Sequence, residues 1–586
     1  MSENTRNLFA ILFIAVSLGT FAVYKTAFKS IPTQTFKVLR VVEGDKFYID
    51  LNGNDRENEG ELFRLDGASA FPLKYSQTAS ENAKKLGLSI SEIISLGYGA
   101  REFSRDGLEG SFVTVEKAKI FLNNKDYSHI LLENGFGFSD GYYNSARVKD
   151  NLKNLMAQEI MVVDNENKTY HEIDCPETLK IKNPALVPFK KITKSFKKCR
   201  KCYLKRDFER DLALHPVIIE SPEPNLRAGQ IELFLISPMK YFTPSNRCRT
   251  NACQALLKNV NEAKEEIGFA IYGFEKQDEI FDALKRAKAR GVRVYGVTDT
   301  DSKGKFAYGD SEKYTKEFSL ITDNSGALMH NKFFIFDNKK VFTGTMNISE
   351  SGAGGYNSNT VVIINSPTIA AAYKNELDQM FSGRFQKKKS GAPPINDAEI
   401  SLYFSPKGNI YENAIKPQID NAKSEILVSA FFLTRKDMVE DLAAAQKRGV
   451  KIKAMIDATA AANAANKHED LRKAGIQTKV ENWGGKNHEK NMVIDSKIFI
   501  IGSANFSRSA VEKNDENLLV IKNPVVARKY REHFMKLYDS IDEKYLKETP
   551  HSESLESGNS CFDGIDNNFD GKIDGQDAGC KRRVLL

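Results

Sequence analysis

The sequence is poor in tryptophan and histidine, and its one conspicuous apolar run is short for a helix that crosses a bilayer. The 586 residues include one Trp and eight His, and the apolar run covers Leu8–Val23. Such a run is typical of a signal-peptide core, and Thr20–Ala22 supplies small residues for cleavage. An uncleaved membrane anchor is the alternative, because the length of the run nearly reaches the lower limit for a helix that spans a bilayer. We therefore interpret residues 1–30 as an export signal or membrane anchor, with the rest of the chain periplasmic, secreted or anchored.

Neither sign of charge dominates the composition. The chain has 85 Lys and Arg against 77 Asp and Glu, a formal net charge of +8. This is a mild lean toward anionic partners such as nucleic acid or a membrane surface. The length exceeds what one hydrophobic core organises, so several domains are expected.

Two long segments of the chain repeat each other. RGVRVYGVTD (290–299) matches RGVKIKAMID (448–457), and each is preceded by a helical pattern and, before that, by an apolar strand. Strands alternating with helices predict an α/β architecture. We place the halves at 228–390 and 395–547, joined at the Gly- and Pro-containing stretch QKKKSGAPP.

Each half contains a His and a Lys two residues apart at the start of an apolar strand. Side chains alternate faces along a strand, so the two polar groups share one face. A turn and a returning strand then bring a hydroxyl and an amide back toward the imidazole. The first half supplies His330, Lys332, Thr345 and Asn347, and the second supplies His488, Lys490, Ser503 and Asn505. Together they are enough to surround one phosphate.

The pattern H-x-K-x4-D-x6-G-[ST]-x-N occurs twice in full, and this resembles the signature of the phospholipase D superfamily. The resemblance implies a bilobal duplicated α/β fold with one active site on a pseudo-two-fold axis, and a phosphodiester substrate. It further implies a phosphohistidine intermediate and no cofactor for catalysis. One imidazole attacks phosphorus while the other protonates the leaving oxygen, and Lys and Asn stabilise the developing charge. We interpret Asp337 and Asp495 as structural.

The two histidines need different protonation states. We expect Glu516, which follows the second motif, to lie near His488, with Ser358 at the corresponding place in the first half. Because a carboxylate favours imidazolium, this predicts His330 as the nucleophile and His488 as the general acid.

Residues 34–145 resemble the micrococcal nuclease domain, a five-stranded OB-type barrel. Arg64 and Asp45 match the family's arginine and first acid, whereas Ser69 and Pro72 stand where two carboxylates belong. Calcium ligation and base catalysis are therefore doubtful there. We expect a degenerate barrel that binds nucleic acid, or one that serves only as a spacer.

Residues 165–206 contain a cysteine and histidine pattern of zinc-ligand type. His171-x3-Cys175 is followed by Cys199-x2-Cys202, which predicts a structural Cys3His zinc site. The module looks like the small zinc module of bacterial DNA alkylation-repair regulators. A disulfide plus one free thiol is the alternative.

The same module is strongly basic around its second cysteine pair. Phosphate-backbone contacts are predicted for Lys190, Lys191, Lys194, Lys197, Lys198, Arg200 and Lys201. A solvated face is the alternative for such a run.

The C-terminal segment 556–582 is acidic and bracketed by cysteines. Its D-x-N-x-D-G spacing resembles a calcium loop, with ligands predicted at Asp566, Asn568, Asp570, Lys572 (carbonyl), Asp574 and Asp577. A solvated acidic turn is the alternative. The remaining cysteines predict two disulfides, Cys248 with Cys253 and Cys561 with Cys580.

These observations predict an exported, metal-independent nuclease that hydrolyses DNA or RNA and for which a monomer suffices. A phospholipase D acting on glycerophospholipid head groups at a membrane is the first alternative, since the same residues serve both reactions. A non-catalytic nucleic-acid-binding protein is the second.

Overall fold

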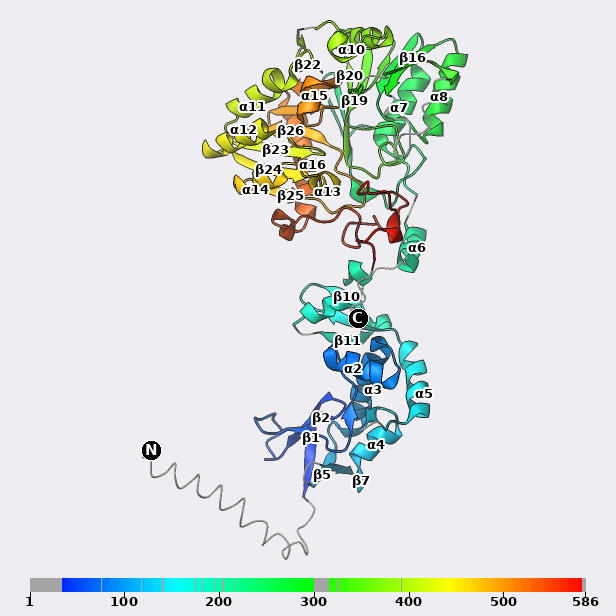
Figure 1. Cartoon of the computed structure of the whole chain (residues 1–586), viewed down its shortest axis with the longest axis vertical. Helices are drawn as coiled ribbons and strands as arrows, with labels where there is room; N and C mark the ends of the chain where they lie inside the picture. Colours follow the sequence, from blue (N-terminus) through cyan, green and yellow to red (C-terminus); the bar gives the residue numbers. More distant parts are fainter. Residues whose placement is uncertain are drawn as a thin grey trace, which may run out of the picture. The chain divides into compact units, whose positions relative to one another are not determined.

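The chain forms two compact units, one extending to Cys202 and one from Tyr203 to Arg583 (Figure 1). The computed structural model describes residues 34–581 except 75, 117–118, 140–141, 174, 183, 194, 203–204, 216, 300–315, 324–325 and 392. The predicted export segment 1–30 lies outside the described residues. No helix in the described part of the chain is long and apolar enough to cross a membrane.

The first unit begins with an antiparallel six-stranded sheet of order β3-β2-β1-β5-β6-β7. The strands are β1 (Thr35–Glu43), β2 (Lys46–Asp50), β3 (Leu62–Arg64), β5 (Phe112–Glu116), β6 (Lys119–Leu122) and β7 (Lys125–Asp126). A short pair, β4 (Ser69–Ala70) with β8 (Gly137–Phe138), lies apart from this sheet. The described strands show no closure into a barrel, so the OB-type barrel stays a prediction.

Four helices accompany this sheet, and their starts follow from their capping residues. They are α2 (Gln77–Leu86), α3 (Ile90–Leu108), α4 (Tyr127–Glu133) and α5 (Ser145–Met156). Helix α3 begins with a capping box, in which the Ser89 hydroxyl accepts from the Glu92 N–H and the Glu92 carboxylate accepts from the Ser89 N–H.

A second sheet, of order β11-β9-β10-β12, completes the first unit. It consists of β9 (Ile160–Asp164), β10 (Thr169–Glu172), β11 (Ala185–Pro188) and β12 (Lys197–Lys198). Single helical turns connect its strands or follow them, namely η1 (Pro176–Lys180), η2 (Phe189–Lys191) and η3 (Arg200–Cys202).

The second unit contains two eight-stranded sheets with the same strand order. The first half has the order β13-β14-β20-β19-β18-β15-β16-β17, and the second has β21-β22-β28-β27-β26-β23-β24-β25. The first sheet comprises β13 (Leu226–Ala228), β14 (Ile231–Ile236), β15 (Glu266–Ile271), β16 (Arg293–Asp299), β17 (Ser319–Asp323), β18 (Lys332–Phe336), β19 (Lys340–Gly344) and β20 (Asn359–Asn365). The second comprises β21 (Ile395–Asp397), β22 (Ile400–Ser405), β23 (Glu425–Ala430), β24 (Lys451–Ile456), β25 (Gln477–Val480), β26 (Lys490–Ile494), β27 (Ile498–Gly502) and β28 (Glu516–Ile521).

Helices cover these sheets in matching places. The matching helices are α7 (Asn251–Glu262), α8 (Asp278–Ala289) and α10 (Pro367–Phe381) in the first half, with α11 (Lys416–Asn421), α12 (Lys436–Lys447) and α16 (Pro524–Ser540) in the second. The second unit also contains α6 (Lys205–Leu214), α13 (Ala458–Ala461), α14 (His468–Lys473) and α15 (Arg508–Glu512). Because α8 and α12 each join two parallel strands, each half contains a β-α-β unit.

A single hydrophobic core joins the two halves. It contains residues of both sheets, such as Phe333 and Val493, together with Tyr373 of α10 and Tyr530 of α16. Two further cores lie within single halves. All residues of β18 and β26 are buried, as expected for central strands covered on both faces. The predicted duplicated α/β fold is thereby confirmed.

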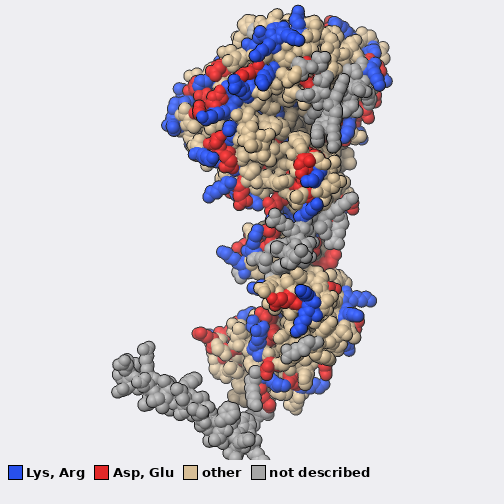
Figure 2. Space-filling view, in the orientation of Figure 1, with Lys and Arg blue, Asp and Glu red and all other residues tan. Residues whose placement is uncertain are grey.

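Both predicted disulfides are present. Cys248 is bonded to Cys253, and Cys561 to Cys580 within the C-terminal segment. That segment contacts both halves of the second unit: the Asp563 carboxylate accepts from the Tyr356 hydroxyl at 2.7 Å, and the Asn567 carbonyl accepts from Thr459 Oγ1 at 2.6 Å. On the visible surface, Lys and Arg are interspersed with Asp and Glu (Figure 2), consistent with the small net charge.

Candidate active site

The two halves exchange backbone hydrogen bonds at the two histidines. The His330 N–H donates to the Asp515 carbonyl at 2.9 Å, and the His488 N–H donates to the Ser358 carbonyl at 3.1 Å. Each histidine is therefore fixed by the residue that leads into β28 or β20 of the opposite half. This crossed pairing brings the two motifs to one buried site.

His330 pairs with a carboxylate from the second half. Its Nδ1 lies 2.8 Å from Glu516 Oε2, and Glu516 also accepts from Ser503 Oγ and Asn514 Nδ2. Burial would raise the pKa of Glu516, but the attraction and hydrogen bond of His330 lower it below its usual range. The expectation that Glu516 lies near His488 is wrong, because β28 delivers its first side chain across the interface to the other half's histidine.

His488 pairs with neutral oxygens instead. Its Nδ1 lies 2.9 Å from the Thr345 carbonyl and 3.2 Å from Asn359 Oδ1. Asn359 is the first residue of β20, so it, and not Ser358, is the counterpart of Glu516. Ser358 contributes its backbone carbonyl to the histidine, and its hydroxyl donates to Glu489.

The motif hydroxyls hold these partners in place. Thr345 Oγ1 donates to Asn359 Oδ1 at 2.9 Å, and Ser503 Oγ donates to Glu516 Oε2 at 2.7 Å. Because Asn359 Oδ1 accepts there, the same oxygen also faces His488 as an acceptor. Each imidazole therefore carries its proton on Nδ1 and leaves Nε2 for chemistry.

Both lysines are fully buried beside the histidines. Lys332 Nζ donates to the His330 carbonyl at 2.9 Å, and Lys490 Nζ donates to the His488 carbonyl at 2.8 Å. Burial lowers the pKa of Lys332 to about 7 and holds that of Lys490 well below its usual range. Burial and the two ammonium groups likewise hold the pKa of His488 well below normal, whereas Glu516 offsets part of the lowering at His330. Burial thus destabilises the cationic forms of these groups, and a bound anion would stabilise them.

Sequence reasoning missed two pairs of matching residues around the site. The rings of Tyr272 and Phe431, which follow β15 and β23, lie 5.0 and 5.2 Å from the rings of His330 and His488. Asp299 accepts from the Met329 N–H, and Asp457 accepts from the Asn487 N–H, so each carboxylate fixes the residue before a histidine. The signal was available, because all four residues stand at equivalent places of the repeat.

The remaining motif residues separate into two groups. Asn347 and Asn505 follow the motif hydroxyls, and the Asn505 side-chain oxygen has no hydrogen-bond partner among the described residues. Asp337 accepts from three consecutive backbone N–H groups that lead into β15, and Asp495 does the same for β23. Those two aspartates therefore anchor strands.

The predicted zinc ligands lie together in the first unit. The ligand atoms of His171, Cys175, Cys199 and Cys202 are all within 4.8 Å of one another. The buried His171 Nδ1 has no hydrogen-bond partner, while its Nε2 lies 3.2 Å from Thr169 Oγ1. An imidazole nitrogen left open toward three sulfurs, with its other nitrogen oriented by a neighbour, fits tetrahedral zinc. No disulfide joins these three cysteines.

The basic residues of this module differ in their surroundings. Lys198 pairs with Glu172 at 2.8 Å and Lys201 with Glu177 at 2.9 Å, so both also serve local ion pairs. Lys190, Lys191 and Lys197 are exposed. Arg200 is half-buried in η3, and Lys194 lies outside the described residues.

An assembled ligand group is seen neither in the predicted calcium loop of the tail nor around Asp45 of the first unit, where calcium ligation was doubtful from the sequence. Among the described residues, only the His171 group brings three or more His, Cys, Asp or Glu ligand atoms together. In the tail, Asp566 and Asp570 accept from backbone N–H groups of their own loop, and Asn568 donates to Asp577. In the first unit, Arg64 lies 3.5 Å from Asp45, without a second carboxylate at Ser69 or Pro72.

Comparison with known proteins agrees with the duplicated site. The family model described as "Cardiolipin synthase, PLD-like domain" matches residues 256–381 and 415–538. A phospholipase D of Rickettsia conorii is 28% identical over 150 residues, which cover 26% of this chain and 74% of that protein. A mitochondrial cardiolipin hydrolase of Mus musculus is 27% identical over 121 residues, covering 21% and 55%.

Among solved structures, the phospholipase D family member Nuc from Salmonella typhimurium is 27% identical, covers 24% of this chain and 95% of its own, and has a TM-score of 0.23. Phosphatidylserine synthase of Haemophilus influenzae is 14% identical, covers 58% and 93%, and has a TM-score of 0.41. The site defines a phosphodiesterase with paired histidines. Residues 256–381 and 415–538, which carry the two motifs, form a duplicated phospholipase D-like domain.

Proposed function

We propose that this protein is a nuclease that cleaves DNA or RNA phosphodiesters through a phosphohistidine at His330. The observation that carries the assignment of roles is the His330–Glu516 contact of 2.8 Å. A phosphorylated imidazole that keeps its Nδ1 proton is cationic, and a buried carboxylate on Nδ1 stabilises that cation. Glu516 therefore supports His330 as the nucleophile through the phosphohistidine cation, an argument different from the sequence-based one, which placed the carboxylate beside the general acid.

The reaction proceeds in two displacements. His330 Nε2 attacks phosphorus, the bond to the leaving oxygen breaks, and His488 Nε2 supplies that oxygen with its proton. Water then attacks the phosphohistidine while the neutral His488 accepts its proton, which restores both imidazoles. Because the bound phosphate offsets the positive charge of the two lysines, it raises the proton affinity of His488 in the complex.

Lys332 and Lys490 stabilise the non-bridging oxygens as negative charge develops on them. Asn347 and Asn505 add amide donors to the same oxygens. No step requires a metal ion.

Nucleic acid is favoured as the substrate by the first unit, where exposed lysines lie on a predicted zinc module. Phospholipid is the second candidate, since the relatives include proteins named phospholipase D and cardiolipin hydrolase. We further propose that the chain is exported, because two disulfides suit an oxidising compartment.

The test is hydrolysis by the full-length chain of plasmid DNA, RNA, and vesicles of phosphatidylcholine or cardiolipin, with and without EDTA. We expect EDTA-resistant cleavage of nucleic acid that is abolished by His330→Asn and retained by His129→Asn, an exposed histidine of the first unit. Lipid head-group release with intact nucleic acid would replace the proposal by the second candidate.

We also propose that zinc bound by His171, Cys175, Cys199 and Cys202 stabilises the first unit. Metal analysis should find one zinc per chain, which Cys175→Ser removes, with a lower melting temperature for the first unit. Unchanged melting with no zinc bound would refute the site.

A further inference from the structure

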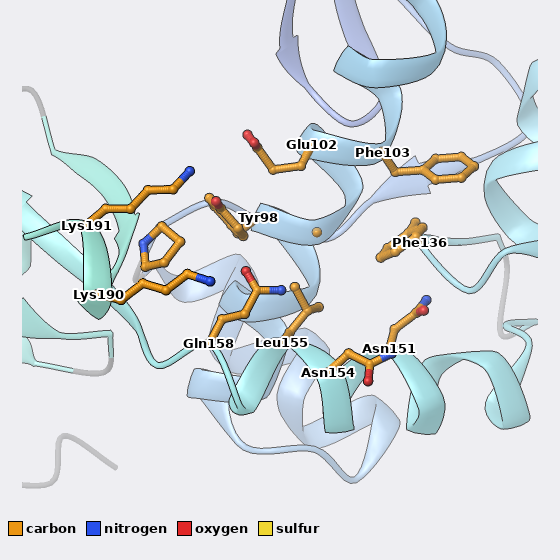
Figure 3. A pocket seen from close by; sticks show the side chains of 12 residues that line it. Tyr98, Glu102, Phe103, Phe136, Asn151, Asn154, Leu155, Gln158, Lys190 and Lys191 are labelled. Carbon is orange, nitrogen blue, oxygen red and sulfur yellow. The ribbon is translucent and has the colours of Figure 1, made fainter.

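A groove of about 440 Å³ lies in the first unit between α3, α5 and the turn η2 (Figure 3). This volume is within the range of small-molecule sites. Three kinds of side chain line the groove, each from a different element: aromatic rings, amides and lysines. None of them belongs to the zinc site or to the histidine site.

Aromatic rings form one wall. Tyr98 and Phe103 come from α3, and the Phe103 and Phe136 ring centroids lie 5.0 Å apart. A Cβ at Gly99 would lie 2.8 Å from both Leu155 Cδ1 and Phe136 Cε1, so the absent side chain lets the Phe136 ring lie close against α3. Tyr98 is buried with Arg101 over its ring, and Phe103 and Phe136 are half-buried, so the rings offer their accessible edges to a base.

Amides from one helix face form the opposite wall. Asn151 and Asn154 of α5 and Gln158 just after it have the i, i+3, i+7 spacing that places side chains on one face. Asn151 Nδ2 donates to the Asn134 carbonyl at 2.7 Å, which orients its oxygen. Asn154 and Gln158 are exposed, and amides can donate to and accept from base edges.

Lys190 and Lys191 stand at the end of the groove, where their ammonium groups point toward it (Figure 3). Their position relative to α5 is fixed by backbone contacts. Pro188 pairs with Ile160, and the Phe189 N–H donates to the Glu159 carbonyl at 3.0 Å. The one acid of the lining, Glu102, is bound by Arg101 and Arg105, so its charge is largely compensated.

From this arrangement we propose that the groove binds single-stranded nucleic acid, with a base between the rings and amides and a phosphate at Lys190 and Lys191. A single strand is favoured because duplex bases are stacked and paired and cannot enter such a groove. The assignment rests on the proposed nuclease function and names a second place where the chain holds its substrate.

The test measures binding of fluorescein-labelled oligothymidylate of about 12 nucleotides, in a His330→Asn background that prevents turnover. The groove variant is Lys190→Ala/Lys191→Ala. Its matched control is Lys84→Ala/Lys85→Ala, two adjacent exposed lysines at the end of α2 in the same unit.

We expect the groove variant to weaken binding about tenfold. The slope of log K against log salt concentration should become shallower by roughly 1.4, since each of the two lost phosphate contacts contributes about 0.7 on a single strand. The control should stay within about twofold. A second variant, Asn154→Ala/Gln158→Ala, should weaken binding of the oligonucleotide but not of an abasic strand of equal length, since it removes only base contacts.

Equal losses in the groove variant and its control would overturn the proposal, as would tighter binding of the matching duplex. Lysine-dependent binding to phosphatidylglycerol vesicles without oligonucleotide binding would also overturn it, in favour of a lipid surface. The nuclease assignment is tested separately, by measuring cleavage with the protein that retains His330. If the protein cleaves nucleic acid but the groove variants bind it normally, the nuclease proposal is retained and the groove proposal is refuted.

Discussion

The two halves of the second unit share a strand order and a backbone geometry but differ at one decisive side chain. The first residue of β28 is Glu516, and the first residue of β20 is Asn359. Each faces the histidine of the opposite half and accepts from a motif hydroxyl. A carboxylate and an amide of similar size therefore occupy equivalent places.

This difference shows how a duplicated fold can give two equivalent histidines unequal roles. The carboxylate stabilises positive charge on His330, whereas the amide and a backbone carbonyl orient His488 without supplying a countercharge. The two halves also differ at the residue after each histidine, which is Asn331 in the first half and Glu489 in the second. Each inequality can be removed by a single substitution.

The largest expected effect comes from substituting each of the two histidines in turn. His330→Asn should lower kcat/KM at least about 10³-fold, because no nucleophile remains. His488→Asn should instead leave a phosphoryl group trapped on His330 when the substrate has a good leaving group, such as p-nitrophenol. Mass spectrometry of the enzyme, quenched in denaturant at alkaline pH because the P–N bond of phosphohistidine is acid-labile, locates the phosphoryl group. Its appearance on His488 in the His330→Asn protein would reverse the assignment.

Glu489→Gln should change how stability depends on pH. Burial raises the pKa of Glu489 to about 7, against 4.5 for an unperturbed glutamate, although hydroxyls of Ser358, Thr360 and Tyr530 hydrogen-bond to it. The folded state therefore holds this proton more tightly than the unfolded state.

The free energy of unfolding should thus fall as pH rises from about 4.5 to about 7, by up to about 3 kcal/mol from this group. The glutamine variant should lack that portion of the decline. The substitution also makes position 489 neutral, like Asn331 at the equivalent place of the first half. Urea unfolding of both proteins at several pH values measures it. Parallel profiles would show that Glu489 does not titrate as described.

Glu516→Gln should make the second half resemble the first and lower kcat about 10²-fold, because the phosphohistidine cation loses its countercharge. The control is Glu512→Gln on α15, which removes a half-buried carboxylate four residues away in sequence that pairs with Arg508. Single-turnover kinetics should show that formation of the phosphoenzyme is slowed. Equal rates for the variant and its control would refute the role of Glu516.

Asn359→Asp should make the first half resemble the second. A carboxylate beside His488 Nδ1 favours imidazolium, so the pKa of His488 rises by about one unit or more. The alkaline limb of kcat/KM, where the general acid loses its proton, should move upward by a similar amount. A pH–rate profile measures the shift. An unmoved alkaline limb would mean that His488 is not the group that titrates there.

Much of the fold was accessible from the sequence, because it is encoded in local and repeated patterns. The match of RGVRVYGVTD with RGVKIKAMID predicted two similar α/β halves, and apolar strands followed by helical periodicity predicted their layers. The zinc-type cluster was also predictable, since Cys and His are few and their spacing is distinctive. The OB-type barrel of the first unit stays a prediction, because closure of a sheet depends on long-range strand pairing.

The active-site chemistry was only partly predictable. The motif identified both histidines, both lysines and the hydroxyls, each within a short stretch of chain. The partner of each imidazole was predicted wrongly, since proximity in sequence suggested that Glu516 serves His488.

The sequence by itself determined the duplicated motifs, the α/β halves and the four clustered zinc-type ligands, because each depends on residue types at short spacing. Only the tertiary structure decided which carboxylate meets which histidine. The shared core around α10 and α16 sets the two sheets against each other, and the ends of β20 and β28 then cross to the opposite histidines. That pairing depends on packing between residues 186 positions apart, for which no local pattern carries a signal.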